Sequence, residues 1–236
     1  MTPFRLLITK KISRGFVINS GLKGVEIMEK EFIKISPINS QELTEKIKNL
    51  FSRKISVAFT SKNAVSGIAS AANIDKNSLP DWKIYCLDGI TREEVVKHFS
   101  KDNIEGTARN AKSLASIILN NSIEKKIIFF CGNKRRDDLP DILKNNGFDV
   151  EELVVYETEL SPVKIVDHFD AVAFFSPSAV ESFFSVNGLD KKIVCFSVGE
   201  TTTAAIKTYT GNRIITSEKP LEESIIKSVL NYKEGR

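Results

Sequence analysis

Hydroxyl and amide side chains cluster at four turns, each placed where a short apolar run gives way to apolar residues at helical spacing. The residues singled out at these turns are Thr60, Ser61, Asn63, Gly132, Ser176, Pro177, Ser178, Gly199, Thr201 and Thr202. Each turn should join the end of a β-strand to the start of an α-helix, where backbone N–H groups have no intrahelical partner. Taken singly, the polar residues are ordinary helix caps worth about 1 kcal/mol each. Each helix start favours an anion by about 0.3–1 kcal/mol. Taken together, the four turns therefore predict a ligand with several carboxylates or phosphates.

Two of these turns lie in a stretch that occurs twice, as VAFTSKNAV at residues 57–65 and as VAFFSPSAV at residues 172–180. Six of the nine positions are identical, and the next expected strand also recurs, as KIYC from Lys83 and as KIVC from Lys192. Fewer expected strands follow the second copy than follow the first. The strands expected near the N-terminus would complete the second lobe. The chain should therefore form two similar lobes, one of them assembled from both ends of the chain.

The repeat also predicts where the lobes begin and end. We expect one discontinuous α/β domain from residues 1–32 plus 161–236 and a second α/β domain from residues 39–153. The extended stretches at residues 33–38 and 154–160 should connect them as a two-stranded linker. Because expected strands alternate with helices, each lobe should hold a mostly parallel sheet flanked by helices.

The two lobes are expected to bind one ligand together. Ligands of parallel α/β sheets bind beyond the carboxyl ends of the strands, and two short connections between lobes allow hinge motion. Ser61 and Ser176, one from each copy of the repeated motif, should therefore face each other across a single cleft.

Composition excludes several classes of protein. The chain of 236 residues is 42% hydrophobic and 27% charged, with a formal net charge of +4, which is ordinary for a globular protein. Its basic residues are interspersed with acidic ones, so no stripe for nucleic acid is expected. No apolar run approaches the roughly 20 residues of a membrane span, and the N-terminal apolar segment is too short for a signal peptide. We expect a cytoplasmic monomer that binds neither nucleic acid nor a membrane.

Metal-binding and nucleophilic motifs are not found in the sequence. His98 and His168 lie far apart without ligand spacing, and the serines lack the GxSxG pattern of hydrolases. No phosphate-loop or dinucleotide-binding motif occurs. Cys86, Cys131 and Cys195 lack CxxC spacing and lie near the ends of expected strands, which is typical of small buried residues. No metal or cofactor is therefore expected.

Four motifs in order resemble the uroporphyrinogen-III synthase family. They are FTSKNAV at 59–65, FCGNKRRDDLPDILKNNGFDVEELVVYET at 130–158, FFSPSAVESF at 174–183 and VGETTTAAI at 198–206. The resemblance implies two α/β lobes joined by a two-stranded ladder and an enzyme without metal or cofactor. It further implies cyclisation of the linear tetrapyrrole hydroxymethylbilane to uroporphyrinogen III, with inversion of ring D and loss of water, in haem biosynthesis.

The resemblance also assigns roles to particular residues. The substrate carries acetate and propionate groups on every ring, and the hydroxyl and amide residues of the four turns would bind them. Tyr156, in the VYET segment, would be the catalytic residue that helps the hydroxyl group leave; its plainer interpretation is packing at the joint between lobes. Glu200 departs from the family pattern by placing a carboxylate near an anionic ligand. The alternatives are a non-catalytic two-lobed binding or sensor protein for a carboxylate-rich molecule, or a sugar-phosphate or nucleotide binder.

Overall fold

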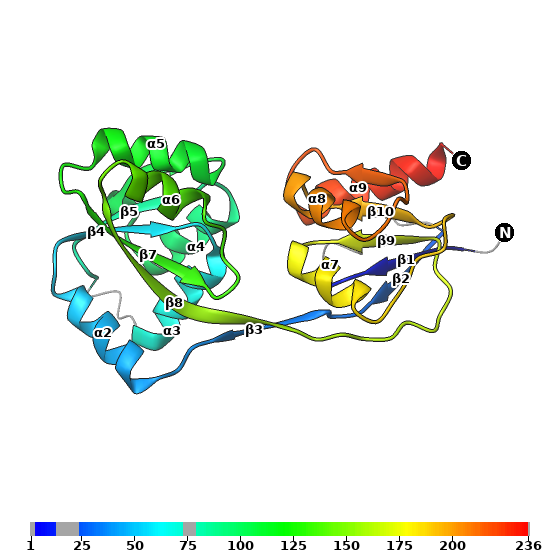
Figure 1. Ribbon diagram of the computed structural model, residues 1–236, viewed down its shortest axis with the longest axis horizontal. Coiled ribbons are helices and arrows are strands. Elements are labelled where there is room, and N and C mark those ends of the chain that lie inside the picture. The colour runs from blue at the N-terminus through cyan, green and yellow to red at the C-terminus, as the bar shows by residue number, and fades with distance from the viewer. Residues whose placement is uncertain (1–2, 13–23, 73–78, 236) are drawn as a thin grey trace. The chain divides into compact units, whose positions relative to one another are not determined.

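The computed structural model describes residues 3–12, 24–72 and 79–235, and the chain divides into two compact units (Figure 1). Unit 1 contains Met1–Lys34 and Glu159–Arg236, and unit 2 contains Ile35–Thr158. Residues 1–2, 13–23, 73–78 and 236, which fall within the expected domains, lie outside the described residues.

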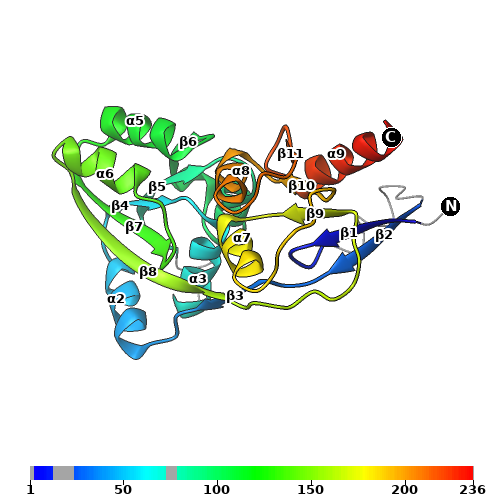
Figure 2. The ribbon, with the colours of Figure 1, turned by 45° about the vertical axis from the view of Figure 1, so that its right-hand side comes forward.

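Unit 1 is built on a five-stranded parallel sheet in the order β11-β10-β9-β1-β2. Among the described residues, its strands are β1 (Phe4–Ile8), β2 (Val25–Glu29), β9 (Ala171–Phe174), β10 (Val194–Ser197) and β11 (Ile214–Thr216), and its helices are α7 (Pro177–Phe184), α8 (Glu200–Lys207) and α9 (Glu222–Glu234). Alternate side chains of the strands point to opposite faces. Leu6 and Phe196 therefore pack with α9, whereas Leu7 and Phe174 pack with α7 and α8. Figure 2 shows these helices beside the sheet of unit 1.

Unit 2 contains a six-stranded sheet in the order β3-β8-β7-β4-β5-β6. Its elements are β3 (Ile33–Pro37), α2 (Gln41–Phe51), β4 (Ile55–Phe59), α3 (Lys62–Ala72), β5 (Trp82–Leu87), α4 (Ile90–His98), η1 (Lys101–Asn103), β6 (Ile104–Ala108), α5 (Ala111–Asn121), β7 (Lys126–Gly132), α6 (Asp138–Asn145) and β8 (Asp149–Leu160). One face packs against α2, α3 and α4 around Phe59 and Phe130, whose rings stack at 5.3 Å. The other face packs against α5 and α6 around Phe129.

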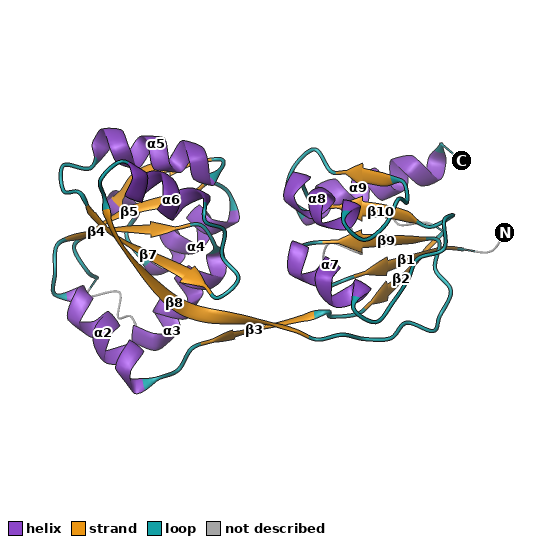
Figure 3. Cartoon of the chain, in the orientation of Figure 1, coloured by secondary structure: helices purple, strands orange, loops and turns teal. Residues whose placement is uncertain are grey.

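The strands β3 and β8 lie side by side and extend across the boundary between the units (Figure 3). Ile38 N–H donates to the Val155 carbonyl at 3.1 Å, and Ser161 N–H donates to the Phe32 carbonyl at 2.9 Å. Residue numbers rise along one strand as they fall along the other, so this pair is antiparallel. The predicted fold class, two mostly parallel sheets flanked by helices, is confirmed.

Each sheet has a point where the chain changes the direction in which it adds strands. In unit 2, β5 and β6 lie on one side of β4, and β7 and β8 lie on the other. In unit 1, β10 and β11 lie on one side of β9, and β1 and β2 lie on the other. Ligands of parallel α/β sheets bind at the carboxyl ends of the strands at such a point. The strands whose ends matter most are therefore β4 and β7 in unit 2, and β9 and β1 in unit 1.

Candidate functional site

Ser61 connects the carboxyl end of β4 to the start of α3. Its Oγ accepts the N–H of Asn63 at 3.2 Å, and its carbonyl accepts the N–H of Ala64 at 3.1 Å. Thr60, Ser61 and Asn63 are all half-buried and lie around this helix start. Ser61 therefore caps α3, as the strand–turn–helix pattern predicts.

Tyr156 reaches the same point from β8, two strands away from β4. Its hydroxyl donates to Ser61 Oγ at 3.2 Å, although the two residues are 95 positions apart in the sequence. The ring passes over Gly132 at the end of β7: a β-carbon there would lie 2.4 Å from Tyr156 Cζ and 2.8 Å from its hydroxyl oxygen. A β-carbon at this position would force the ring to move. Gly132, Tyr156 and Ser61 thus form one contact group.

The environment of Tyr156 keeps its phenol protonated. Burial raises the pKa of Tyr156 above its ordinary value near 10, and the neighbouring Cys131 raises this pKa further. The hydrogen bond with Ser61 acts in the opposite direction and lowers the pKa of Tyr156. The net effect is a raised pKa, so the phenol carries its proton at neutral pH and is available as a proton donor.

The matching position of unit 1 is Ser176, between β9 and α7. Its Oγ accepts the N–H of Ala179 at 3.1 Å, and Pro177 occupies the first turn of the helix. Ser178 is half-buried and Pro177 is exposed in that turn. Ser176 and Ser61 therefore have equivalent capping roles, each in its own unit.

The run of three threonines at the start of α8 separates into different environments. Gly199 precedes the helix, and Thr201 is exposed whereas Thr202 is only 3% exposed. The next residue, Thr203, is buried, and its Oγ1 lies 2.5 Å from Ser197 Oγ and 2.6 Å from Thr216 Oγ1. Thr203 thus joins α8 to two strands, a role that the sequence pattern did not indicate.

Two charged residues lie near the strand ends of unit 1. Glu200 is exposed in the first turn of α8, where a carboxylate complements the helix dipole. Lys10 follows β1 closely; its Nζ pairs with Glu222 and lies 4.9 Å from the centre of the Phe175 ring. Lys10 is absent from the residues predicted for the site.

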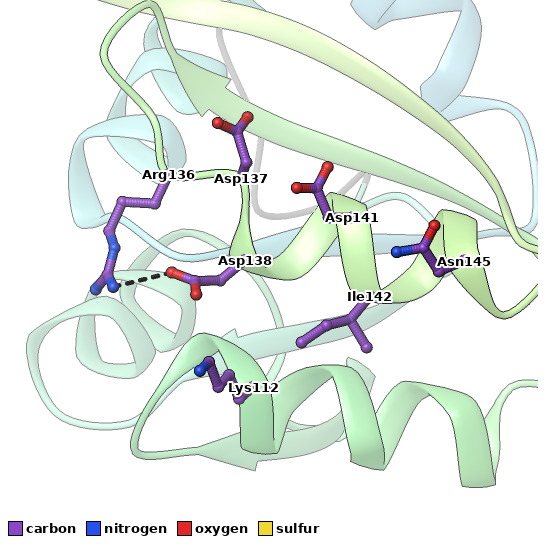
Figure 4. Close-up of a pocket in the computed structure, with 7 residues that line it drawn as sticks. All are labelled: Lys112, Arg136, Asp137, Asp138, Asp141, Ile142 and Asn145. Carbon is purple, nitrogen blue, oxygen red and sulfur yellow. Dashed lines mark ion pairs between the residues drawn. The ribbon is translucent and has the colours of Figure 1, made fainter.

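A hollow of about 500 Å³ lies beside α5 and α6 of unit 2 (Figure 4). It is lined by Lys112, Arg136, Asp137, Asp138, Asp141, Ile142 and Asn145. Arg136 pairs with Asp138 at 2.9 Å, and three carboxylates outnumber the two cations. This lining is unsuited to a ligand rich in carboxylates, and it contains none of the predicted site residues.

The three cysteines are buried, and His98 is paired with a carboxylate. Burial raises the pKa of the Cys86 and Cys195 thiols to about 12 and that of Cys131 to about 11, so all three are protonated at neutral pH. His98 Nε2 lies 3.0 Å from Glu94. Within residues 3–12, 24–72 and 79–235, no group of three histidine, cysteine or acidic side chains is arranged to hold a metal ion. No helix of these ranges is long and apolar enough to cross a membrane.

Comparisons with known proteins agree on one family. A family model described as uroporphyrinogen-III synthase HemD matches residues 21–227. A mutant uroporphyrinogen III synthase of the extremely thermophilic bacterium Thermus thermophilus covers 99% of this chain and 100% of its own, with a TM-score of 0.67 and 13% identity. The uroporphyrinogen-III synthetase of Helicobacter pylori 26695 covers 97% of this chain and 99% of its own, with a TM-score of 0.67 and 16% identity.

At these identities the structural matches show the fold, and the family model, which spans most of the chain, shows the family. The prediction from the four sequence motifs is confirmed. The chain belongs to the uroporphyrinogen-III synthase family of cyclising lyases in porphyrin biosynthesis.

Proposed function

We propose that this chain closes hydroxymethylbilane into uroporphyrinogen III, with inversion of ring D and loss of one water molecule. The family match supports the reaction. The observation that supports the site is the hydrogen bond that the Tyr156 hydroxyl donates to Ser61 Oγ, 3.2 Å away, at the carboxyl end of β4. No observation on the described residues favours the alternative, a non-catalytic binding or sensor protein.

The carboxylates of the substrate would be bound by helix starts in both units. In unit 2 we assign this role to Thr60, Ser61 and Asn63 at the start of α3. In unit 1 we assign it to the first turns of α7 and α8, with Ser176, Pro177, Ser178, Gly199, Thr201 and Thr202. Each helix start favours an anion by about 0.3–1 kcal/mol, so several acting together select a ligand with many carboxylates. Because Thr202 is only 3% exposed, Thr201 is the better candidate for direct contact.

Tyr156 would act as the general acid for departure of the hydroxyl group. Its phenol gives a proton to the hydroxymethyl oxygen while the C–O bond breaks, and water leaves. The pyrrole nitrogen supplies the electron pair, which produces an electrophilic azafulvene. The substituted carbon of ring D attacks it and forms a spiro intermediate. The bond from that carbon to the methylene of ring C then breaks, and this methylene, now an azafulvene in turn, bonds to the unsubstituted carbon of ring D. The proton lost from that carbon restores the phenol. The sequence of steps involves no net oxidation or reduction.

Choice of isomer is a separate task from proton transfer. Hydroxymethylbilane closes without help, but to isomer I. The protein must hold the chain so that the substituted carbon of ring D is the nearest nucleophile, which is catalysis by positioning. We propose that the enzyme does this as a cytoplasmic monomer. Its three cysteines are free thiols, which suits a reducing compartment.

The test is incubation of the purified chain with enzymatically generated hydroxymethylbilane, followed by separation of the product isomers. We expect isomer III to exceed isomer I, and heat-denatured protein, the control, to give isomer I. Formation of isomer I alone, at the uncatalysed rate, would contradict the proposed function.

A further inference from the structure

The direction of the Tyr156 side chain depends on an irregularity between β7 and β8. Cys131 is the partner of Val154, but the next residue, Gly132, is the partner of Tyr156, so Val155 is left without a register partner on β7. Side chains of a regular strand alternate between faces, and an extra residue changes the direction in which the next one points. Val155 and Tyr156 accordingly both pack with the same core cluster. The bulge thus aims the phenol across Gly132 towards Ser61.

Asn133 closes the gap that the bulge leaves. Its backbone N–H donates to the Tyr156 carbonyl at 3.3 Å. Its side-chain Oδ1 accepts the Thr158 N–H at 2.8 Å, and its Nδ2 donates to the Thr158 carbonyl at 3.5 Å. One residue beyond the end of β7 therefore holds β8 on both sides of Glu157. This arrangement restrains the backbone that carries the phenol.

We propose that Gly132 and Asn133 are positioning residues for Tyr156: the glycine leaves the space that the ring occupies, and the asparagine holds the backbone that aims it. This inference rests on the proposed function and changes the role of Gly132, which the sequence suggested as a substrate-binding residue. A residue that binds substrate changes KM when it is altered. A residue that positions the proton donor changes kcat and acts only through the Tyr156 hydroxyl.

The experiment uses Gly132→Ala and Asn133→Ala, each alone and combined with Tyr156→Phe. The matched controls are Gly188→Ala, where a β-carbon meets no atom within 4 Å, and Asn145→Ala on the exposed face of α6. We expect each test variant to lower kcat for isomer III about tenfold or more while KM changes little. In the Tyr156→Phe background the same substitutions should lower kcat by less than about a further twofold, because the hydroxyl that they position is already absent. The controls should keep the kcat of the unaltered chain.

Thermal unfolding of each variant separates loss of the fold from loss of positioning. If Gly132→Ala does not fold, Asn133→Ala alone tests the positioning role, because this substitution adds no atom near the Tyr156 ring. Wild-type kcat in Asn133→Ala, or losses that multiply fully with Tyr156→Phe, would overturn the positioning role. Failure of the unaltered chain to form isomer III would instead overturn the proposed function, so the two failures are distinguishable.

Discussion

At the scale of single residues, Ser61 makes one more hydrogen bond than its sequence pattern predicts. A serine between a strand and a helix is expected to cap the helix, and Ser61 does accept the Asn63 N–H. It also accepts the hydroxyl of Tyr156 from two strands away. The first contact is local in sequence and predictable. The second depends on how three strands pack, and no local pattern contains it.

Replacement of Tyr156 by Phe tests the proton donor directly. The ring and its packing on Gly132 are kept, and only the hydroxyl is lost. We expect the rate of isomer III formation to fall about tenfold or more, because general acid catalysis contributes roughly 10²–10⁴-fold. Tyr209→Phe is the control, because this tyrosine is 48% exposed and lies in unit 1. An undiminished rate in Tyr156→Phe would remove the phenol from the mechanism.

At the scale of elements, the sequence predicts the strand–turn–helix units, but it does not predict how closely a helix packs against a neighbouring strand. Helix α3 begins beside Ser61 and lies close to β8, which carries Tyr156. The close approach occurs at Gly67, where a β-carbon would lie 2.9 Å from the Val155 carbonyl oxygen. Gly67 therefore allows α3 to lie close to β8. This close packing also sets the distance between Tyr156 on β8 and Ser61 at the start of α3.

The substitution Gly67→Ala tests this spacing. Alanine is favoured over glycine inside a helix by about 1 kcal/mol, so a helix free of contacts would become more stable. Here the added methyl group meets backbone, and we expect the free energy of unfolding to fall by about 1–3 kcal/mol. Urea unfolding measures the change, with Ser70→Ala on the exposed face of the same helix as the control. Equal or greater stability in Gly67→Ala would show that α3 does not depend on this contact.

At the scale of the whole molecule, both units contain buried cysteine thiols that are free. Cys86 and Cys131 lie in unit 2, and Cys195 lies in unit 1. Burial raises their pKa values in the folded chain to about 11 or 12. The unfolded chain exposes them, and their pKa values return to about 8.5. Between these values the unfolded state binds fewer protons than the folded state.

The cysteines therefore make folding sensitive to alkaline pH. The stability they contribute is complete below their unfolded pKa and is lost as the pH rises through their folded pKa. We expect the free energy of unfolding to fall between pH about 9 and about 12. A variant with alanine at all three positions should show a shallower fall, whatever its stability at neutral pH. Denaturant unfolding at a series of pH values measures both slopes, and equal slopes would contradict this account.

The sequence by itself determined the family, the fold class and the caps, Ser61 and Ser176. These features are readable because alternation of strands and helices, and the hydrogen bond from a cap to its own helix, involve residues close together in the chain. Only the tertiary structure decided that Tyr156 crosses Gly132 to reach Ser61 and that Thr202 is buried while Thr201 is exposed. The physical reason is that strand register and burial depend on the packing of the whole sheet. A one-residue bulge changes the direction of a side chain, and the local sequence pattern does not reveal it.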